Sequence, residues 1–289
     1  MLPERAPGPR GGIPGIPDIS DEEFALFQSL IRREAGILLT PTKKPMLVGR
    51  LFRRLNSLGL SSFSEYYRHV VYAGEREMVQ LLDAICTNET WFFRNPDHFA
   101  FIKDQLVPEW GADVRASRRQ PRLRVWSAAC SSGEEPYSLA MVLLEALPGW
   151  EVNILATDLS SRALARARAA TWPIEKSQDI PPRYLSQYML RGTRSQQGKM
   201  RAGAELRKAV VFDRLNLNHE MWPIQQAGPF DLLFCRNVLM YLDPAARERV
   251  IGRLADRLSP LGHLFLGDAE GTGGGDRLRL VAPSVYRQR

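Results

Sequence analysis

The sequence predicts an α/β chain, with a small all-helical unit at the N-terminus followed by a parallel sheet that carries helices on both faces. In the first part of the 289 residues, apolar side chains recur at helical spacing between capping and stop signals. From Arg122 onward, short apolar strands alternate with amphipathic helices, which is typical of a parallel sheet. The composition, 44% hydrophobic and 25% charged, excludes a largely disordered or fibrous chain.

Residues 1–17 are rich in proline and glycine, and we expect a disordered arm there. Residues 18–85 are predicted to form the helical unit. Its first helix begins at Ser20, where Glu23 completes a capping box, and ends at Gly36. Three further helices follow, indicated by leucines at 47–58, by a second capping pattern at 62–65 and by apolar residues at 78–85.

Residues 86–121 are expected to be a linker that includes a segment covering the ligand, and 122–289 the sheet domain. The predicted strands are Leu123–Ser127, Val152–Thr157, Val210–Phe212, Leu232–Cys235 and His263–Leu266. Helices are predicted at 136–147, at 162–170 and after Asp243, which would be the cap before Pro244.

Two stretches interrupt this alternation of strands and helices. Ser259–Gly262 has the composition of a turn. Residues 179–209 contain three glycines and scattered basic residues, and the stretch is too long for a plain loop. We therefore expect an inserted subdomain with its own structure there.

Charge and cysteine content narrow the class of protein. The net charge of +7 favours an anionic partner without naming it, so nucleic acid, a membrane surface or an acidic protein segment all stay open. The three cysteines lack metal-ligand or paired-redox spacing, so no metal site is expected. No apolar run reaches the roughly 18 residues of a membrane span. We expect a cytoplasmic protein.

Ligands of open parallel sheets bind outside the carboxyl ends of the strands. After the first predicted strand comes a run of small residues that ends in Gly133, followed by Glu134 and Glu135. Asp158 follows the second strand, 25 residues beyond Gly133. That spacing suits a carboxylate that accepts hydrogen bonds from ribose hydroxyls. The pattern predicts a nucleoside site.

A dinucleotide is the obvious rival ligand, because its pyrophosphate binds at a helix N-terminus. Here Glu134 and Glu135 occupy that place, and two carboxylates would repel a pyrophosphate by about 1 kcal/mol each in water. The G-x-G-x-x-G fingerprint is also missing. The charge pattern favours a cationic nucleoside such as S-adenosylmethionine. A purely structural alternative is that both glutamates complement the helix dipole.

Four separated motifs resemble the chemotaxis receptor methyltransferases of the CheR type, over a range from about Ile19 to the C-terminus. They are Thr87–Arg94, Val125–Ser138, Arg214–Leu217 and Phe234–Tyr241. The resemblance implies a Rossmann-like class I methyltransferase sheet of seven strands, an N-terminal helical domain and a small inserted antiparallel β-subdomain. It implies transfer of a methyl group from S-adenosylmethionine to glutamates on cytoplasmic receptor helices, which gives methyl esters and S-adenosylhomocysteine.

The resemblance also implies roles for single residues. Cofactor contacts would come from Asn88, Thr90, Arg94, Glu134, Asp158, Asn216, Leu217, Arg236 and Asn237. In that set Glu134 would meet the amino-acid part, Asp158 the ribose, and Asn216 with Leu217 the adenine. Arg236 and Asn237 would lie beneath the methionyl part. Arg94 and Tyr241 are the expected catalytic residues, which orient the acceptor and the sulfonium.

No general base is expected. A glutamate acceptor, with a pKa of about 4.3, is already a carboxylate at neutral pH. The four histidines at 69, 98, 219 and 263 are scattered, and none lies in a nucleophile–base arrangement.

Partner surfaces can be predicted as well. Arg50, Arg53 and Arg54 share a helix face by their spacing, and we expect this face to dock acidic receptor helices. Family members that tether to a receptor's C-terminal pentapeptide tend to carry Gly-x-Gly, whereas this chain has Gly192-Thr193-Arg194. Pentapeptide tethering is therefore doubtful. The family also implies a monomer.

Two other classes of protein remain as alternatives. A nucleic-acid methyltransferase would explain the basic charge, but it would need a pocket for a flipped base. Amino-methylating examples often carry Asn/Asp-Pro-Pro-aromatic after the fourth strand, where this chain has Arg236–Leu239. The other alternative is a non-catalytic binding module that keeps the fold without the reaction. Against it, every cofactor position of the family motifs that can be matched carries the expected residue in this chain.

Overall fold

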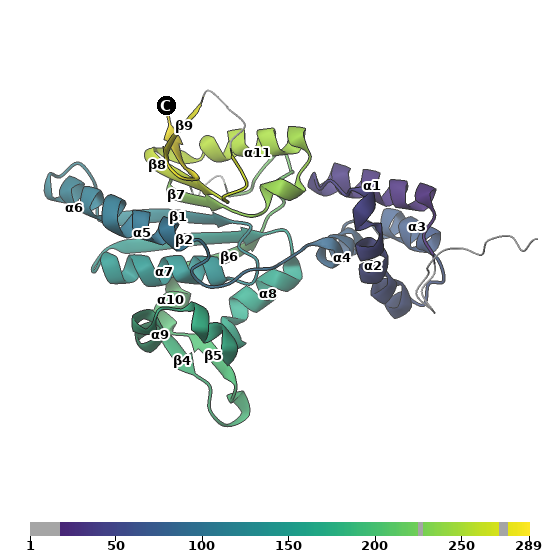
Figure 1. Ribbon diagram of the computed structural model, residues 1–289, viewed down its shortest axis with the longest axis horizontal. Helices are drawn as coiled ribbons and strands as arrows, with labels where there is room; N and C mark the ends of the chain where they lie inside the picture. The colour runs from purple at the N-terminus through teal and green to yellow at the C-terminus, as the bar shows by residue number, and fades with distance from the viewer. Residues whose placement is uncertain (1–17, 225–227, 272–276) are drawn as a thin grey trace, which may run out of the picture. The chain divides into compact units, whose positions relative to one another are not determined.

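The computed structural model describes residues 18–224, 228–271 and 277–289 (Figure 1). The arm predicted at 1–17 lies outside the described residues. The chain divides into two compact units, Met1–Cys86 and Thr87–Arg289. The expected linker at 86–121 is too long, because the helices from residue 96 to 115 contribute to the core of the second unit. No helix among the described residues is long and apolar enough to span a bilayer.

The first unit is all-helical, as predicted. Its elements are α1 (Asp21–Ala35), the short η1 (Pro41–Lys43), α2 (Lys44–Leu58), α3 (Phe63–Ala73) and α4 (Glu75–Ile85). Both hydrogen bonds of the capping box between Ser20 and Glu23 are present at the start of α1. Gly36 and Gly59 end α1 and α2 in the left-handed conformation, with φ of 70° and 68°.

A buried carboxylate holds α2 against α4. Glu77 is 4% exposed and accepts from Arg54 Nε at 2.8 Å, Arg54 Nη2 at 2.5 Å and the Tyr66 hydroxyl at 3.1 Å. Burial raises the pKa of Glu77, but the hydrogen bond and charge of Arg54 lower it by more, so the net shift is downward. Arg50 donates to the carbonyls of Ile85 and Cys86 at the end of α4. Of the three arginines predicted to dock a partner, only Arg53 is exposed.

The second unit is built on a mixed sheet of seven strands, in the order β6-β2-β1-β7-β8-β10-β9. The first five strands in this order run parallel, and β10 and β9 are antiparallel additions at one edge. The bounds are β1 (Arg122–Ala128), β2 (Glu151–Asp158), β6 (Val210–Arg214), β7 (Phe230–Cys235), β8 (Leu258–Leu266), β9 (Leu278–Ala282) and β10 (Val285–Gln288). The predicted fold class is confirmed.

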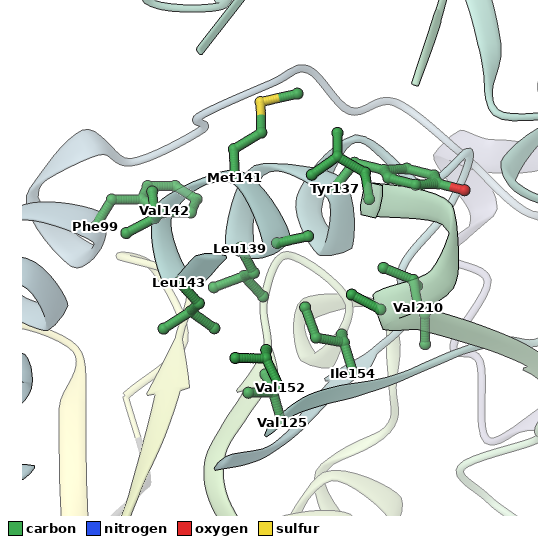
Figure 2. Close-up of a cluster of buried hydrophobic side chains, with 14 of the residues drawn as sticks. Phe99, Val125, Tyr137, Leu139, Met141, Val142, Leu143, Val152, Ile154 and Val210 are labelled. Atoms are coloured by element: carbon green, nitrogen blue, oxygen red, sulfur yellow. The ribbon is translucent and has the colours of Figure 1, made fainter. Parts of the chain in front are cut away.

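Helices cover both faces of this sheet (Figure 1). One face carries α5 (Pro96–Phe101), η2 (Ile102–Leu106), α6 (Val107–Arg115), α7 (Glu134–Ala146) and α8 (Ser161–Ala169), and the other carries α11 (Pro244–Ala255). Figure 2 shows Leu139 and Leu143 of α7 pointing toward the valines and isoleucine of β1 and β2. This apolar layer holds α7 against the sheet, and the first turn of α7 directly follows the loop after β1.

The inserted subdomain is a three-stranded antiparallel sheet in the order β3-β5-β4. Its elements are β3 (Thr171–Pro173), η3 (Ile174–Asp179), α9 (Pro182–Tyr188), β4 (Met189–Arg191), η4 (Arg194–Gln196) and β5 (Lys199–Ala202), and α10 (Ala204–Ala209) leads back to β6. The insertion therefore begins before the predicted residue 179. Its first strand has only three residues, which is too short to show a period.

The turn predicted at Ser259–Gly262 is wrong, because these residues lie within β8. The pairing with β7 shifts from Phe230–Leu258 to Leu232–His263, so the segment bulges out of the ladder. A Cβ on Gly262 would lie 2.6 Å from the carbonyl oxygen of Phe230. The glycine marks close backbone approach rather than a reversal of the chain.

Two histidines lie in an aromatic cluster between α5 and β8. His98 packs edge-on against Phe265 at 5.3 Å between ring centroids, and His263 against Phe101 at 5.9 Å. Both histidines are 3% exposed. Burial, followed by the charge of Arg236, lowers the pKa of His98 to about 4. Burial and the charges of two arginines lower the pKa of His263 to about 4 as well.

We expect Arg54→Ala to destabilise the first unit by about 2–3 kcal/mol, because it leaves the buried Glu77 carboxylate without its cation. The loss is smaller than for a fully buried ion pair, because Arg54 is partly exposed to solvent. Arg53→Ala is the matched control, since the neighbouring exposed arginine should change stability by less than about 0.5 kcal/mol. Denaturant unfolding of both variants measures the difference. Equal effects would contradict the role assigned to the pair.

The second unit should lose stability between pH 6.5 and pH 4. Both histidines have folded pKa values below their unfolded values, so the unfolded chain takes up protons first as the pH falls. Each histidine adds a slope of up to about 1.4 kcal/mol per pH unit in this window. His263→Phe keeps the aromatic packing and should remove one share of the slope in calorimetric unfolding. A slope unchanged in this variant would refute the assignment to His263.

Candidate functional site

The predicted site residues gather where the strand order of the sheet reverses. From β1 the chain moves outward to β2 and β6, and then crosses to β7 on the other side of β1. Ligands bind at such a switch point, outside the carboxyl ends of the strands. The loops that follow β1, β2 and β7 all begin at this edge, because those strands run parallel.

The loop after β1 uses its main-chain donors inside the protein. The N–H groups of Ala129 and Cys130 both donate to the Thr157 carbonyl, at 2.8 and 2.9 Å. The N–H of Ser131 donates to Asp158 Oδ2 at 2.7 Å. A pyrophosphate site depends on free N–H groups at this position. These three donors are not free, which argues against a dinucleotide independently of side-chain charge.

Gly133 is required for packing between helices. Its φ is +95°, and a Cβ there would lie 3.0 Å from the Cβ of Ala167 on α8. The absence of a side chain at Gly133 therefore makes room for α8.

Asn88 and Asp158, far apart in the sequence, belong to one hydrogen-bonded cluster. Asp158 is 7% exposed, and its Oδ1 accepts from the Ser160 N–H at 2.8 Å. Asn88 Nδ2 donates to Ser160 Oγ at 3.2 Å, and the Asn88 carbonyl accepts from Ser131 Oγ at 2.9 Å. The cluster fixes the orientation of the Asp158 carboxylate and attaches the segment from 88 to 94 to the ends of β1 and β2.

The two glutamates that open α7 each have a cation of their own. Glu134 is fully buried and forms an ion pair with Lys176 of η3, while Glu135 is 9% exposed and forms one with Arg236 Nε at 2.7 Å. These two internal cations were not foreseen from the sequence, where the carboxylates were considered only against a ligand. A lysine from the inserted subdomain and an arginine after β7 neutralise them, and no spacing rule links either residue to α7.

Arg236 connects three parts of the unit. In addition to Glu135, it donates from Nη1 to the Arg94 carbonyl at 2.8 Å, and its Nη1 lies 3.1 Å from His98 Nδ1. Its side chain is 1% exposed. Because its guanidinium is enclosed, Arg236 can contact a bound cofactor only through its main chain. This limits the role predicted for Arg236 beneath the methionyl part.

The covering segment presents an arginine on an aromatic ring. The Arg94 guanidinium carbon lies 4.2 Å from the centroid of Trp91, and Nη1 donates to the Glu89 carbonyl at 3.3 Å. Trp91 is 41% exposed and Arg94 is half-buried, so both can reach a ligand. The carbonyl of Thr90 accepts from Lys176 at 3.1 Å. Thr90 and Arg94 thus lie on one short segment attached to the sheet edge.

The remaining predicted residues follow β6 and β7. Asn216 and Leu217 come directly after β6 and are 8% and 9% exposed. Asn237 follows β7 with φ +59°, a left-handed conformation that asparagine tolerates. Tyr241 ends the 3₁₀ turn η5 (Leu239–Tyr241) and is 38% exposed, so it is a surface residue rather than a core aromatic.

Glu270 is a residue that the sequence argument missed. Its fully buried carboxylate accepts from the N–H groups of Asn237 at 2.6 Å, Gly267 at 2.9 Å and Met240 at 3.2 Å. It therefore shapes the loop that carries Asn237 and leads into Tyr241. The signal was available, since Glu270 lies four residues after the end of β8 and Asp158 is the last residue of β2, so both are acidic residues near the carboxyl end of a strand.

The donor set fits S-adenosylmethionine. Asp158 has a fixed carboxylate that would suit ribose hydroxyls, Leu217 would provide an apolar contact, and Arg94 and Tyr241 both keep some exposed surface. When bound, this cofactor would supply an electrophilic methyl group. Among the described residues, no group of histidine, cysteine and carboxylate side chains is placed to hold a metal ion.

Comparison with known proteins identifies the same two parts. A family model described as "CheR methyltransferase, all-alpha domain" matches residues 22–86, and one described as "CheR methyltransferase, SAM binding domain" matches 88–281.

Curated relatives match over most of the chain. "Chemotaxis protein methyltransferase 2" of Pseudomonas aeruginosa is 38% identical over 269 residues, which cover 92% of each protein. "Chemotaxis protein methyltransferase" of Escherichia coli is 38% identical and covers 87% of this chain and 85% of its own. The protein of that name from Borreliella burgdorferi is 32% identical and covers 94% and 95%.

Both domain models, in the same order and with the same boundary as the two compact units, account for nearly all of the described chain. The resemblance seen in the sequence motifs is confirmed. The chain belongs to the CheR methyltransferase family, and its second unit contains the S-adenosylmethionine-binding domain.

Proposed function

We propose that this protein methylates glutamate side chains on the cytoplasmic helices of methyl-accepting chemotaxis receptors, and so forms methyl esters in signal adaptation. The observation that carries the proposal is the match of both family domains, in order, to relatives named chemotaxis protein methyltransferase. The protein would act in the cytoplasm as a monomer. The products would be the receptor ester and S-adenosylhomocysteine.

The cofactor is proposed to bind across the carboxyl ends of β1, β2, β6 and β7. Asp158 would accept from the ribose, while Asn216 and Leu217 would flank the adenine. Asn88, Thr90 and Arg94 would cover the amino-acid part from above, with Glu134 and Asn237 at its other side. This assignment is supported by the shared cluster of Asn88 and Asp158 and by the position of the other residues directly after strands.

The reaction needs alignment rather than proton removal. A receptor glutamate is ionised at neutral pH and can attack a methyl group directly. His98 and His263 are buried, and their pKa values near 4 keep them neutral, so neither offers a base to the surface. Holding two reactants in line can remove about 7–11 kcal/mol of barrier in favourable cases.

Arg94 and Tyr241 are proposed to supply that alignment. The Arg94 guanidinium, stacked on Trp91, would hold the acceptor carboxylate by charge and hydrogen bonds, since planar guanidinium groups match carboxylate geometry. Tyr241 would face the transferring methyl and close the site on the side of β7. The buried Arg236 would keep the Arg94 main chain in place.

The receptor-docking surface is proposed to centre on Arg53. Arg50 and Arg54 have partners within the first unit, so they support α2 rather than present free charge. A long acidic helix would meet Arg53 and the exposed Lys43 near the start of α2. The sequence Gly192-Thr193-Arg194 between β4 and β5 leaves a pentapeptide tether doubtful.

Mass spectrometry of receptor cytoplasmic fragments incubated with this protein and S-adenosylmethionine tests the function. We expect an added methyl on glutamates. Arg94→Ala should lower kcat by about 100-fold or more, with S-adenosylhomocysteine affinity changed less than about threefold, because the side chain orients the acceptor. Arg118→Ala, an exposed arginine of the same unit, is the control. Equal losses of turnover and affinity would contradict the orienting role, and transfer to RNA alone would favour a nucleic-acid methyltransferase.

Arg53→Glu should raise the KM for a receptor fragment severalfold at low salt and leave kcat nearly unchanged. An exposed charge at the edge of an interface changes mainly the rate at which the two proteins associate. A fragment that lacks its C-terminal pentapeptide keeps any tether out of the measurement. Arg76→Glu makes the same charge reversal on α4 and serves as the control. If both reversals have the same effect, net charge rather than the α2 surface attracts the receptor.

A further inference from the structure

Lys176 forms an ion pair with Glu134, the residue whose carboxylate is proposed to bind the amino-acid part of the cofactor. It comes from η3 of the inserted subdomain, and its ammonium contacts Glu134 Oε1 and, at 3.1 Å, the carbonyl of Thr90. The same two residues, Glu134 and Thr90, are proposed to contact the cofactor. A lysine ammonium thus lies where the α-ammonium of S-adenosylmethionine would bind.

The burial of Glu134 makes the two ammonium groups alternatives. The residue has no exposed surface, and its other oxygen accepts from Ser132 Oγ at 2.7 Å. A second cation cannot reach Glu134 while Lys176 remains, and it would also meet the like charge of Lys176. Lys176 could instead stay in place and bind the carboxylate of the cofactor, but the α-ammonium of the cofactor would then have no access to Glu134.

We propose that Lys176 is a placeholder for the cofactor's α-ammonium: it pairs with Glu134 in the free protein and is displaced when the cofactor binds. The inference rests on the proposed function and concerns how tightly the site holds its cofactor.

The charges on the two partners support an exchange of this kind. A fully buried carboxylate is costly without a cation, so Glu134 needs a partner before the cofactor arrives. The Lys176 side chain is 33% exposed and flexible, and its ammonium returns to water at modest cost. Because one ammonium replaces another, Glu134 stays paired in both states.

The exchange lowers affinity only for ligands that carry an α-ammonium. S-adenosylhomocysteine has this group and must displace Lys176. The related nucleoside 5′-methylthioadenosine lacks the whole amino-acid part and can bind the ribose and adenine contacts without competing. The two ligands therefore separate an effect at Glu134 from a change in the fold.

Calorimetric titration of the full chain with both ligands tests the proposal. Lys176→Met should bind S-adenosylhomocysteine about three- to tenfold more tightly, since the competing ion pair is partly exposed, and 5′-methylthioadenosine with unchanged affinity. Lys199→Met, an exposed lysine on β5 of the same subdomain, should match the parent protein for both ligands. Weaker binding of S-adenosylhomocysteine to Lys176→Met would overturn the proposal and make Lys176 part of the cofactor site.

Thermal unfolding gives a second measurement in case Lys176→Met is hard to purify. The free variant should melt below the parent, because Glu134 has lost its partner, and S-adenosylhomocysteine should raise its melting temperature by more than it raises that of the parent. Equal shifts would overturn the placeholder role. If the parent protein binds neither 5′-methylthioadenosine nor S-adenosylhomocysteine, the proposed function fails. If it binds both ligands and Lys176→Met binds them with the same affinities, only this inference fails.

Discussion

The buried ion pair between Arg236 and Glu135 is the interaction on which the arrangement of the site depends. It joins the residue after β7 to the first turn of α7, and the same guanidinium holds the carbonyl of Arg94. Removal of either partner would leave a charge enclosed in the core, which costs several kcal/mol. Three chain segments that are distant in sequence are thereby held at one edge of the sheet, and they support the half-buried Arg94 and the exposed Tyr241.

Much of the architecture could be predicted from local patterns. The capping box at Ser20, the glycines that end α1 and α2, and the short apolar strands each act within a few residues, so sequence alone reveals them. The prediction of a turn at Ser259–Gly262 was wrong because bulges and turns favour the same residue types, and only the pairing with β7 distinguishes them. The strand at Thr171–Pro173 was missed because its partner, β5, lies beyond a helix and another strand.

The sequence predicts which candidate residues lie at one edge of the sheet, but not the ion pairs that they form. Residues that follow strands were found because parallel strands bring their carboxyl ends together, and Asp158 and Asn88 do share a cluster. Charge balance does not follow from such a rule. Lys176 and Arg236 reach Glu134 and Glu135 from 42 and 101 residues away, and no pattern along the chain joins them. Carboxylates that look like a negative patch in sequence are internally neutralised in the fold.

The anchoring of the loop after β7 by Glu270 has a consequence for how this fold can vary. Every residue proposed to touch the cofactor or the acceptor precedes Leu266, so the last part of the chain looks like an optional edge of the sheet. Yet the carboxylate that gathers the amides of Asn237 and Met240 comes from beyond that point. Replacing the whole chain after Leu266 with that of a relative, rather than the β9–β10 hairpin alone, would therefore also replace Glu270, which supports the loop that carries Asn237 and leads into Tyr241.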